Sequence, residues 1–87
     1  MLFRSHLTSI MAKHAGSGVR INAVAPGLVA TPWTADWHER KAGVELVAPL
    51  HRVATAEDIA EACLALISTR YATGQTLVVD GGLGLMI

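Results

Sequence analysis

The chain has 87 residues, which is enough for one small domain at most. Its seven basic and seven acidic side chains cancel and form no basic run, so the sequence lacks the charge pattern of a nucleic-acid-binding protein. No apolar stretch reaches the roughly 18–20 residues that cross a bilayer, and the first residues do not form a secretory signal.

The single cysteine also bears on the compartment of the protein. Cys63 cannot form an internal disulfide bond, and one unpaired thiol fits a reducing compartment. We therefore expect a cytoplasmic protein with neither a membrane nor a nucleic-acid partner.

Apolar residues make up 52% of the sequence, a high share for a chain of this length. Two interpretations are open: further strands or another subunit cover part of the apolar surface, or the core is compact and unusually apolar. The first interpretation is favoured.

Residues 2 to about 15 are predicted to form a helix. Lys13 and His14 fall in its last turn, where cations suit the helix dipole, and Gly16 is a good C-terminal stop. The apolar side chains recur at helical spacing, and they are Phe3, Leu7, Ile10 and Met11.

The stretch 19–32 reads VRINAVAPGLVATP and contains the clearest strand signal. Its apolar, β-branched run from Val19 to Ala25 is typical of a strand buried on both faces. Pro26 and Gly27 end that strand, because proline cannot donate to a sheet ladder and glycine allows a turn or a close approach. In open parallel sheets ligands bind at the carboxyl ends of the strands, so this bend is the candidate site.

Residues 36–50 form an amphipathic stretch of mixed charge. Gly43 and Pro49 interrupt it, which predicts one or two short helices and not one long helix. Trp33 and Trp37 stand one helical turn apart at its start.

A second clear helix is predicted from Thr55 to about Arg70. Thr55 is a plausible N-cap, with Asp58 at the N3 position to complete a capping box. The predicted buried stripe consists of Ile59, Cys63, Leu66 and Ile67. On that stripe Cys63 is expected to be a small core residue and not a nucleophile.

Residues 75–79 are predicted to form a second strand, parallel to the first across a right-handed helical crossover. Asp80-Gly81-Gly82 then ends it in a turn. Other chemistries find no support: the four histidines lack a metal-binding spacing, and the serines have no base in a nucleophile motif.

Four segments together resemble one protein family. They are the stretch 19–32 with Asn22, Pro26, Gly27 and Thr31, Arg52 with the helix start 55–60, Thr73-Gly74-Gln75, and Val79-Asp80-Gly81-Gly82. In this order, over roughly residues 5 to 84, they are similar to the C-terminal segment of short-chain dehydrogenases/reductases. The resemblance implies an α/β fold, with residues 1–87 as the C-terminal part of a doubly wound, Rossmann-like parallel sheet. It would contribute about two strands, two main helices and a short helical lid at about residues 33–50.

The same resemblance places the family's catalytic Tyr-x-x-x-Lys pair outside this chain. Aligning Leu7-Thr8 with the family's Leu-Thr puts the lysine at about Met1 and the tyrosine before it. The glycine-rich phosphate turn would belong to the absent N-terminal half. Tyr71, the only tyrosine, has no lysine four residues further on. We therefore expect no catalytic residue here.

What the resemblance implies for the bend is a contact with the nicotinamide of NAD or NADP. It assigns this contact to Pro26, Gly27, Val29 and Thr31: the backbone at Val29 would point outward, and Thr31 would offer a hydroxyl. The alternative is a plain strand-to-helix turn with Thr31 as a cap. In the lid, Trp33 and Trp37 would contact substrate or only cap an apolar edge.

The implied function is hydride transfer between NAD(P) and a small-molecule alcohol or ketone. We expect the isolated chain to be inactive and to bind NAD(P) weakly or not at all. One alternative is a non-catalytic interaction subunit that docks on a full-length relative, and another is an unrelated small α/β binding module. A homo-oligomer is also implied, whereas the substrate and the choice of NAD or NADP stay open.

Overall fold

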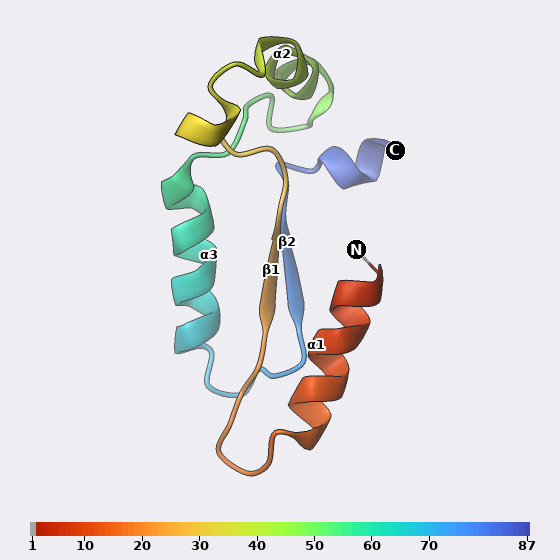
Figure 1. Ribbon diagram of the computed structural model, residues 1–87, viewed down its shortest axis with the longest axis vertical. Coiled ribbons are helices and arrows are strands. Elements are labelled where there is room, and N and C mark those ends of the chain that lie inside the picture. Colours follow the sequence, from red (N-terminus) through yellow and green to blue (C-terminus); the bar gives the residue numbers. More distant parts are fainter. Residues whose placement is uncertain (1) are drawn as a thin grey trace.

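The computed structural model describes the backbone of residues 2–87 and the side chains of residues 5–87. The expectations for Met1 and Phe3 therefore lie outside the described side chains. Figure 1 shows a two-stranded sheet flanked by helices, with a helical excursion beyond the upper end of the strands. The elements are α1 (Leu2–His14), β1 (Ala23–Pro26), η1 (Pro32–Thr34), α2 (His38–Val47), α3 (Ala56–Ser68), β2 (Thr76–Val79) and η2 (Leu83–Met86).

The two strands pair in parallel, as predicted, with Ala23 opposite Thr76 and Pro26 opposite Val79. The first strand is shorter than the predicted run 19–25 and includes Pro26. It is half-buried, not buried on both faces, because only one strand pairs with it and its other edge is open.

The residues just before β1 bind the α3–β2 connection mainly with side chains, beside one backbone bond from the Gly74 N–H to the Ile21 carbonyl at 2.7 Å. Arg20 donates from its guanidinium to the carbonyls of Leu66, Ile67, Thr69 and Ala72 at 2.8–3.1 Å. These carbonyls lie at and just beyond the C-terminal end of α3, where orphan carbonyls need donors.

Asn22 continues the same connection. Its Nδ2 donates to the Ala72 carbonyl at 3.0 Å, and its Oδ1 accepts from the Gln75 N–H at 3.0 Å. We call Arg20 and Asn22 together the N-terminal clamp, because they fix the entry of β1 against the entry of β2.

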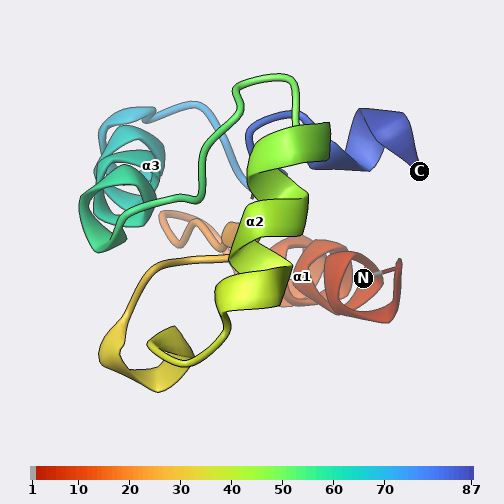
Figure 2. The ribbon, with the colours of Figure 1, turned by 90° about the horizontal axis from the view of Figure 1, so that it is seen from above.

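The two long helices lie on opposite faces of the sheet, as Figures 1 and 2 show. In Figure 2 the strands point toward the viewer, and the path from β1 through α3 to β2 is left-handed. The predicted right-handed crossover is therefore wrong. Right-handedness follows from a strand that feeds its helix directly, whereas here the long segment 27–55 separates β1 from α3.

Helix α3 begins as the sequence predicts. The Thr55 hydroxyl accepts from the Asp58 N–H at 3.1 Å, and the Asp58 carboxylate accepts from the Thr55 N–H at 2.8 Å. The predicted stripe is not buried, however: Cys63 is exposed and Ile67 is 67% exposed, while Ala62 is the buried residue of the helix. The stripe has only a narrow two-stranded sheet to cover it.

Residues 36–50 contain one short helix, α2, within the predicted one or two, and η1 precedes them. Gly43 does not break the helix but lies inside α2, and Pro49 follows it. Trp33 stands in η1 and Trp37 at the N-cap of α2, so the two rings do not share one helix.

The described chain has very little core. Ala48 and Ala62 are its buried apolar residues, and none of the larger side chains is fully buried. Its accessible surface is 6564 Å², whereas a compact 9.2-kDa monomer exposes about 4,900 Å². The radius of gyration is 14.8 Å, against about 12 Å for a compact chain of this length. The interpretation of a surface meant to be covered fits these values better than that of a compact core.

None of the described helices is long and apolar enough to cross a membrane.

Candidate functional site

The bend after β1 lies against the end of β2. The Gly27 N–H donates to the Val79 carbonyl at 2.9 Å, which extends the ladder by one bond. A Cβ at Gly27 would stand 3.0 Å from both Cα and Cβ of Asp80. Glycine is therefore required here by close approach of two backbones.

The next three residues are fixed by backbone hydrogen bonds to the segment before α3. The Ala54 N–H donates to the Leu28 carbonyl at 3.1 Å, and the Ala30 N–H donates to the Ala54 carbonyl at 2.8 Å. Val29 thus forms a parallel bridge with Ala54. In such a bridge the polar groups of the central residue point the opposite way, so the Val29 N–H faces away from Ala54, and it makes no hydrogen bond within the described residues.

Thr34 holds the end of this loop. It is 6% exposed, and its hydroxyl donates to the Val29 carbonyl at 2.7 Å while accepting from the Thr31 N–H at 3.0 Å. The sequence analysis missed Thr34, although a threonine three residues after Thr31 is a capping-box pattern that could have indicated it. Thr31 is the N-cap of η1 in a capping box with Thr34, as the alternative interpretation of this turn expects, and its hydroxyl makes no other hydrogen bond within the described part of the chain.

The four residues predicted to contact a cofactor therefore lie on one short loop at the carboxyl end of the sheet. Gly27, Val29 and Thr31 are half-buried, and Pro26 is exposed. Pro26 lines a groove of about 520 Å³ between α3 and β1, whereas Gly27, Val29 and Thr31 line none of the cavities found in the described residues. The loop is an open wall and not an enclosed pocket.

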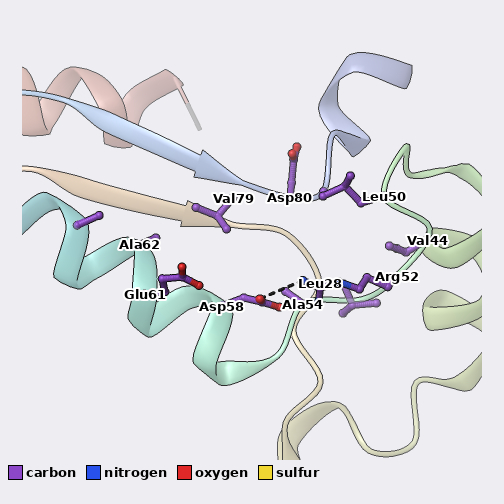
Figure 3. Close-up of a pocket in the computed structure, with 12 residues that line it drawn as sticks. Leu28, Val44, Leu50, Arg52, Ala54, Asp58, Glu61, Ala62, Val79 and Asp80 are labelled. Carbon is purple, nitrogen blue, oxygen red and sulfur yellow. Dashed lines mark hydrogen bonds and ion pairs between the residues drawn. The ribbon is translucent and has the colours of Figure 1, made fainter.

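A cavity of about 280 Å³ lies beside this wall, between α3, the segment 50–54 and the ends of the strands (Figure 3). Arg52 and Asp58 form a two-pronged ion pair at its mouth, with Nη1–Oδ2 at 2.6 Å and Nη2–Oδ1 at 3.0 Å. The Arg52 guanidinium and then the Thr55 N–H hold the pKa of Asp58 well below its usual range, and the Asp58 carboxylate raises the pKa of Arg52. Both charges are satisfied, so the pair acts as a brace between segment 50–54 and α3.

Asp80 is used by its own turn. Its two carboxylate oxygens accept from the N–H groups of Gly82 and Gly84, each at 2.9 Å. Gly81 and Gly82 have φ values of 63° and 88°, which only glycine adopts readily. The geometry favours the interpretation of Asp80 as a turn residue over that of a ligand.

The two tryptophans of the predicted lid differ in environment. Trp33 is 83% exposed, whereas Trp37 is half-buried and has the Arg40 guanidinium 4.9 Å from its ring centre. Trp37 is therefore part of the packing of α2, and Trp33 is the tryptophan that remains free for a contact. Among the described residues no group of histidine, cysteine, aspartate or glutamate could hold a metal ion.

Comparison with known proteins finds one consistent match. Residues 5–84 match the family model described as enoyl-(acyl carrier protein) reductase. The chain is 48% identical over 82 residues to ketoacyl reductase 2 of the granaticin polyketide synthase from Streptomyces violaceoruber, a match covering 91% of this chain and 33% of that protein. The chain thus spans about a third of the length of the curated relatives it matches.

Solved structures give the same result. A small-chain dehydrogenase in complex with NADPH superposes with a TM-score of 0.86 at 32% identity, over 94% of this chain and 39% of that one. A 4-hydroxyisoleucine dehydrogenase mutant complexed with NADH and succinate gives a TM-score of 0.80 at 30% identity, over 94% of this chain and 36% of that one.

Proposed function

Because this chain belongs to the short-chain dehydrogenase/reductase family, we propose that it forms the C-terminal segment of an NAD(P)-dependent oxidoreductase. The activity of the whole enzyme would be hydride transfer between a nicotinamide cofactor and an alcohol or ketone. In this assignment the chain supplies the wall that holds the nicotinamide and the lid over the substrate.

The observation that carries the proposal is the geometry of the loop 26–31. Its backbone is fixed on one side by Ala54 and at its end by Thr34, while the Val29 N–H has no partner within the described residues and the Thr31 hydroxyl has none beyond its capping box with Thr34. A carboxamide offers both a carbonyl acceptor and an amide donor. A rigid loop with a free N–H and a neighbouring hydroxyl, whose oxygen can take part in more than one hydrogen bond, is complementary to such a group.

The nicotinamide, when bound, supplies the hydride or accepts it. The residues of this chain would bind and orient it: Val29 through its N–H, Thr31 through its hydroxyl, and Gly27 by letting β1 and β2 approach closely. Orientation of the reacting ring is a large part of catalysis, because the donor and acceptor carbons must meet in a defined geometry.

We place no general acid in this chain. Tyr71 is fully exposed, just beyond the C-terminal end of α3, and Gln75 stands four residues further on. General acid catalysis needs a proton donor within hydrogen-bond reach of the substrate oxygen. The isolated chain is therefore expected to show no turnover and weak or no NAD(P) binding, which titration with NADH and NADPH checks by fluorescence.

The assignment itself is tested with a chimaera, in which this chain replaces the matching third of the granaticin ketoacyl reductase. The chimaera is expected to reduce ketones with a nicotinamide cofactor. Thr31→Val removes the hydroxyl and keeps the shape, so the KM for the cofactor is expected to rise about tenfold, the loss of one hydrogen bond of about 1.4 kcal/mol.

Thr31→Ser is the matched control, since it keeps the hydroxyl and should keep the cofactor KM. Val29→Pro removes the free N–H and leaves the two bonds that Leu28 and Ala30 make to Ala54. An inactive but folded chimaera, or an unchanged cofactor KM in both Thr31→Val and Val29→Pro, would contradict the proposal.

The segment 33–50 is proposed as the substrate lid, with Trp33 as its contact residue. Lids close over a substrate to exclude water. Trp33→Ala in the chimaera is expected to raise the KM for the ketone and leave that for the cofactor unchanged. Trp37→Ala should instead lower stability, because Trp37 packs within the lid.

A second candidate function is a non-catalytic subunit that docks on a full-length relative. The large accessible surface favours it, since so much exposed apolar area is typical of a chain that binds another. Co-purification of this chain with an intact short-chain dehydrogenase, with the chimaera inactive, would support this function over the first.

A further inference from the structure

The outward edge of Val29, formed by its N–H and its carbonyl, is held by one side chain. The inner side of the loop is bonded to Ala54, which donates to the Leu28 carbonyl and accepts from the Ala30 N–H. The N–H and the carbonyl of a trans peptide point in opposite directions, so both polar groups of Val29 point away from Ala54. On that outer side the Thr34 hydroxyl donates to the Val29 carbonyl at 2.7 Å, and no other described residue bonds to either group.

The same hydroxyl also holds Thr31. Its oxygen accepts from the Thr31 N–H at 3.0 Å, so a single atom bridges the peptides on either side of Ala30. A hydroxyl can donate and accept at one atom, whereas each polar atom of a side-chain amide does only one of the two. Thr34 also faces the Thr31 side chain, because the two residues form a capping box. The two residues expected to contact the nicotinamide therefore depend on one oxygen atom for their orientation.

Thr34 itself is not a ligand contact. Its side chain is 6% exposed, and its β-branch leaves few positions for the hydroxyl. It lies in η1, where the chain leaves the loop 26–31 for α2, directly after Trp33, which is 83% exposed (Figure 1). Of residues 33–50 only Thr34 and Ala48 are buried, and α2 buries none. The start of the lid is thus attached to the loop 26–31 through Thr34.

We propose that Thr34 is a positioning residue for the hydride transfer, and that its hydroxyl holds the nicotinamide loop and the start of the substrate lid in one geometry. Donor and acceptor carbons react only when they are close and aligned, so a small displacement of either partner costs much of the rate. A residue that sets both surfaces therefore acts on the binding of both ligands and on kcat. The inference rests on the proposed function and adds the residue that links its cofactor contacts to its substrate contact.

Thr34→Val in the chimaera is the principal test. Valine keeps the shape but loses both hydrogen bonds, and its methyl cannot stay at 2.7 Å from the Val29 carbonyl oxygen, since carbon lies about 3.3–3.6 Å from such an oxygen. Fluorescence titration with NADH and NADPH, which needs no turnover, should give a cofactor Kd raised about tenfold. The KM for the ketone should rise as well, and kcat should fall about tenfold or more.

This pattern differs from that of either ligand contact alone. Thr31→Val is expected to weaken the cofactor only, and Trp33→Ala to raise the KM for the ketone only. Thr34→Ser keeps both bonds and should restore all three values. If Thr34→Val does not fold, Thr34→Ala is the second variant: it removes the hydroxyl without placing a methyl against the Val29 carbonyl, and should give the same pattern.

A matched control separates positioning from stability. The Thr69 hydroxyl donates to the Ala65 carbonyl at 2.7 Å, beyond the opposite end of the strands. Thr69→Val therefore loses a bond of the same kind, and urea unfolding shows how closely its loss of stability matches that of Thr34→Val. It should leave the cofactor Kd, the KM for the ketone and kcat unchanged.

A double-mutant cycle shows whether Thr34 acts through Thr31. In the unaltered chimaera Thr31→Val should raise the cofactor Kd about tenfold. In the Thr34→Val background the Thr31 hydroxyl is no longer oriented, so the same substitution should raise the Kd by only about twofold to threefold. Additive effects would show that the two residues act independently and would overturn the inference.

An unchanged cofactor Kd in a folded Thr34→Val chimaera would also overturn it, and so would equal effects of Thr34→Val and Thr69→Val on the kinetic constants. In either case the proposed function stands, provided that Thr31→Val or Val29→Pro still weakens the cofactor. If neither of those two variants changes cofactor binding, the proposed function fails and this inference fails with it.

Discussion

The two ends of β1 are held in different ways. Before the strand, side chains make most of the bonds: Arg20 and Asn22 reach the carbonyls and the N–H of residues 66–75, beside one backbone bond from Gly74 to Ile21. After the strand, backbone bonds predominate, from Gly27 to Val79 and from Leu28 and Ala30 to Ala54. The amino end of β1 is fixed mainly by two particular side chains, and its carboxyl end mainly by main-chain hydrogen bonds.

The difference teaches how a strand end is left free for a ligand. Where side chains make the bonds, their polar groups are already hydrogen-bonded and do not bind a ligand. Where the main chain makes them, alternate polar groups still point outward, as the Val29 N–H does. The carboxyl end of β1 can therefore be rigid and still offer donors and acceptors.

The largest effect is expected at the main-chain end. Gly27→Val would force a branched side chain against the backbone of Asp80, where a Cβ alone already stands at 3.0 Å. The chimaera should lose about 3 kcal/mol of stability, the upper range for overpacking. Urea unfolding measures it, and Gly43→Ala, at a helical site open to solvent, is the control that should not destabilise.

The side-chain end is broken by Arg20→Ala. The carbonyls of Leu66 and Ile67 then lose the donor that Arg20 supplies, while those of Thr69 and Ala72 keep a second donor, and the free energy of unfolding should fall by about 2 kcal/mol. Arg20→Lys keeps the charge but not the planar fork, so it should recover less than half of the loss. Full recovery by lysine would show that charge alone stabilises this end.

A smaller effect is expected from Thr34→Val, which tests the one side chain that holds the main-chain end. The Val29 carbonyl and the Thr31 N–H lose the hydroxyl between them, at a cost of about 1 kcal/mol. Thr34→Ser should restore the stability. If Thr34→Val matched wild type, the backbone bonds to Ala54 would be sufficient by themselves.

The smallest effect is a pH dependence of the Arg52–Asp58 brace. The pKa of Asp58 is lower in the folded chain than in the unfolded chain. Its contribution to the free energy of unfolding is therefore complete above the unfolded-state pKa of about 3.9, and it is lost as the pH falls through the folded-state pKa. The difference in urea midpoint between the chimaera and its Asp58→Asn variant should shrink below about pH 4. A constant difference from pH 7 to pH 3 would contradict it.

The sequence predicted the parts of the fold that local signals determine. Helix α1, the capping box of Thr55 and Asp58 and the turn at Asp80 all depend on neighbouring residues or on a clear period, and the parallel pairing of the strands followed from the helix placed between them. The resemblance supplied the family and the α/β class, and the family match bears both out.

What the sequence missed depends on contacts between distant segments. The handedness of the crossover is set by a long excursion and not by residues near the strands. The stripe of Ile59, Cys63, Leu66 and Ile67 has the pattern of a buried face, yet pattern alone does not say whether its cover is on the same chain. Arg20 was overlooked because it acts on carbonyls of a distant segment, which the sequence does not mark, whereas the spacing of Thr34 from Thr31 is a local signal that was not used.

The engagement of Arg20 has a consequence for the order of folding. Helix α3 ends without a glycine, and the group that satisfies its last carbonyls is the guanidinium of a residue 46–52 positions earlier in the chain. Its final turn can therefore become firm only once β1 has docked, so amide hydrogen exchange at residues 66–69 should slow together with that of the strands. The C-terminal end of α3 is thus stabilised by a tertiary contact, and the residue that makes this contact lies far from the helix in the sequence.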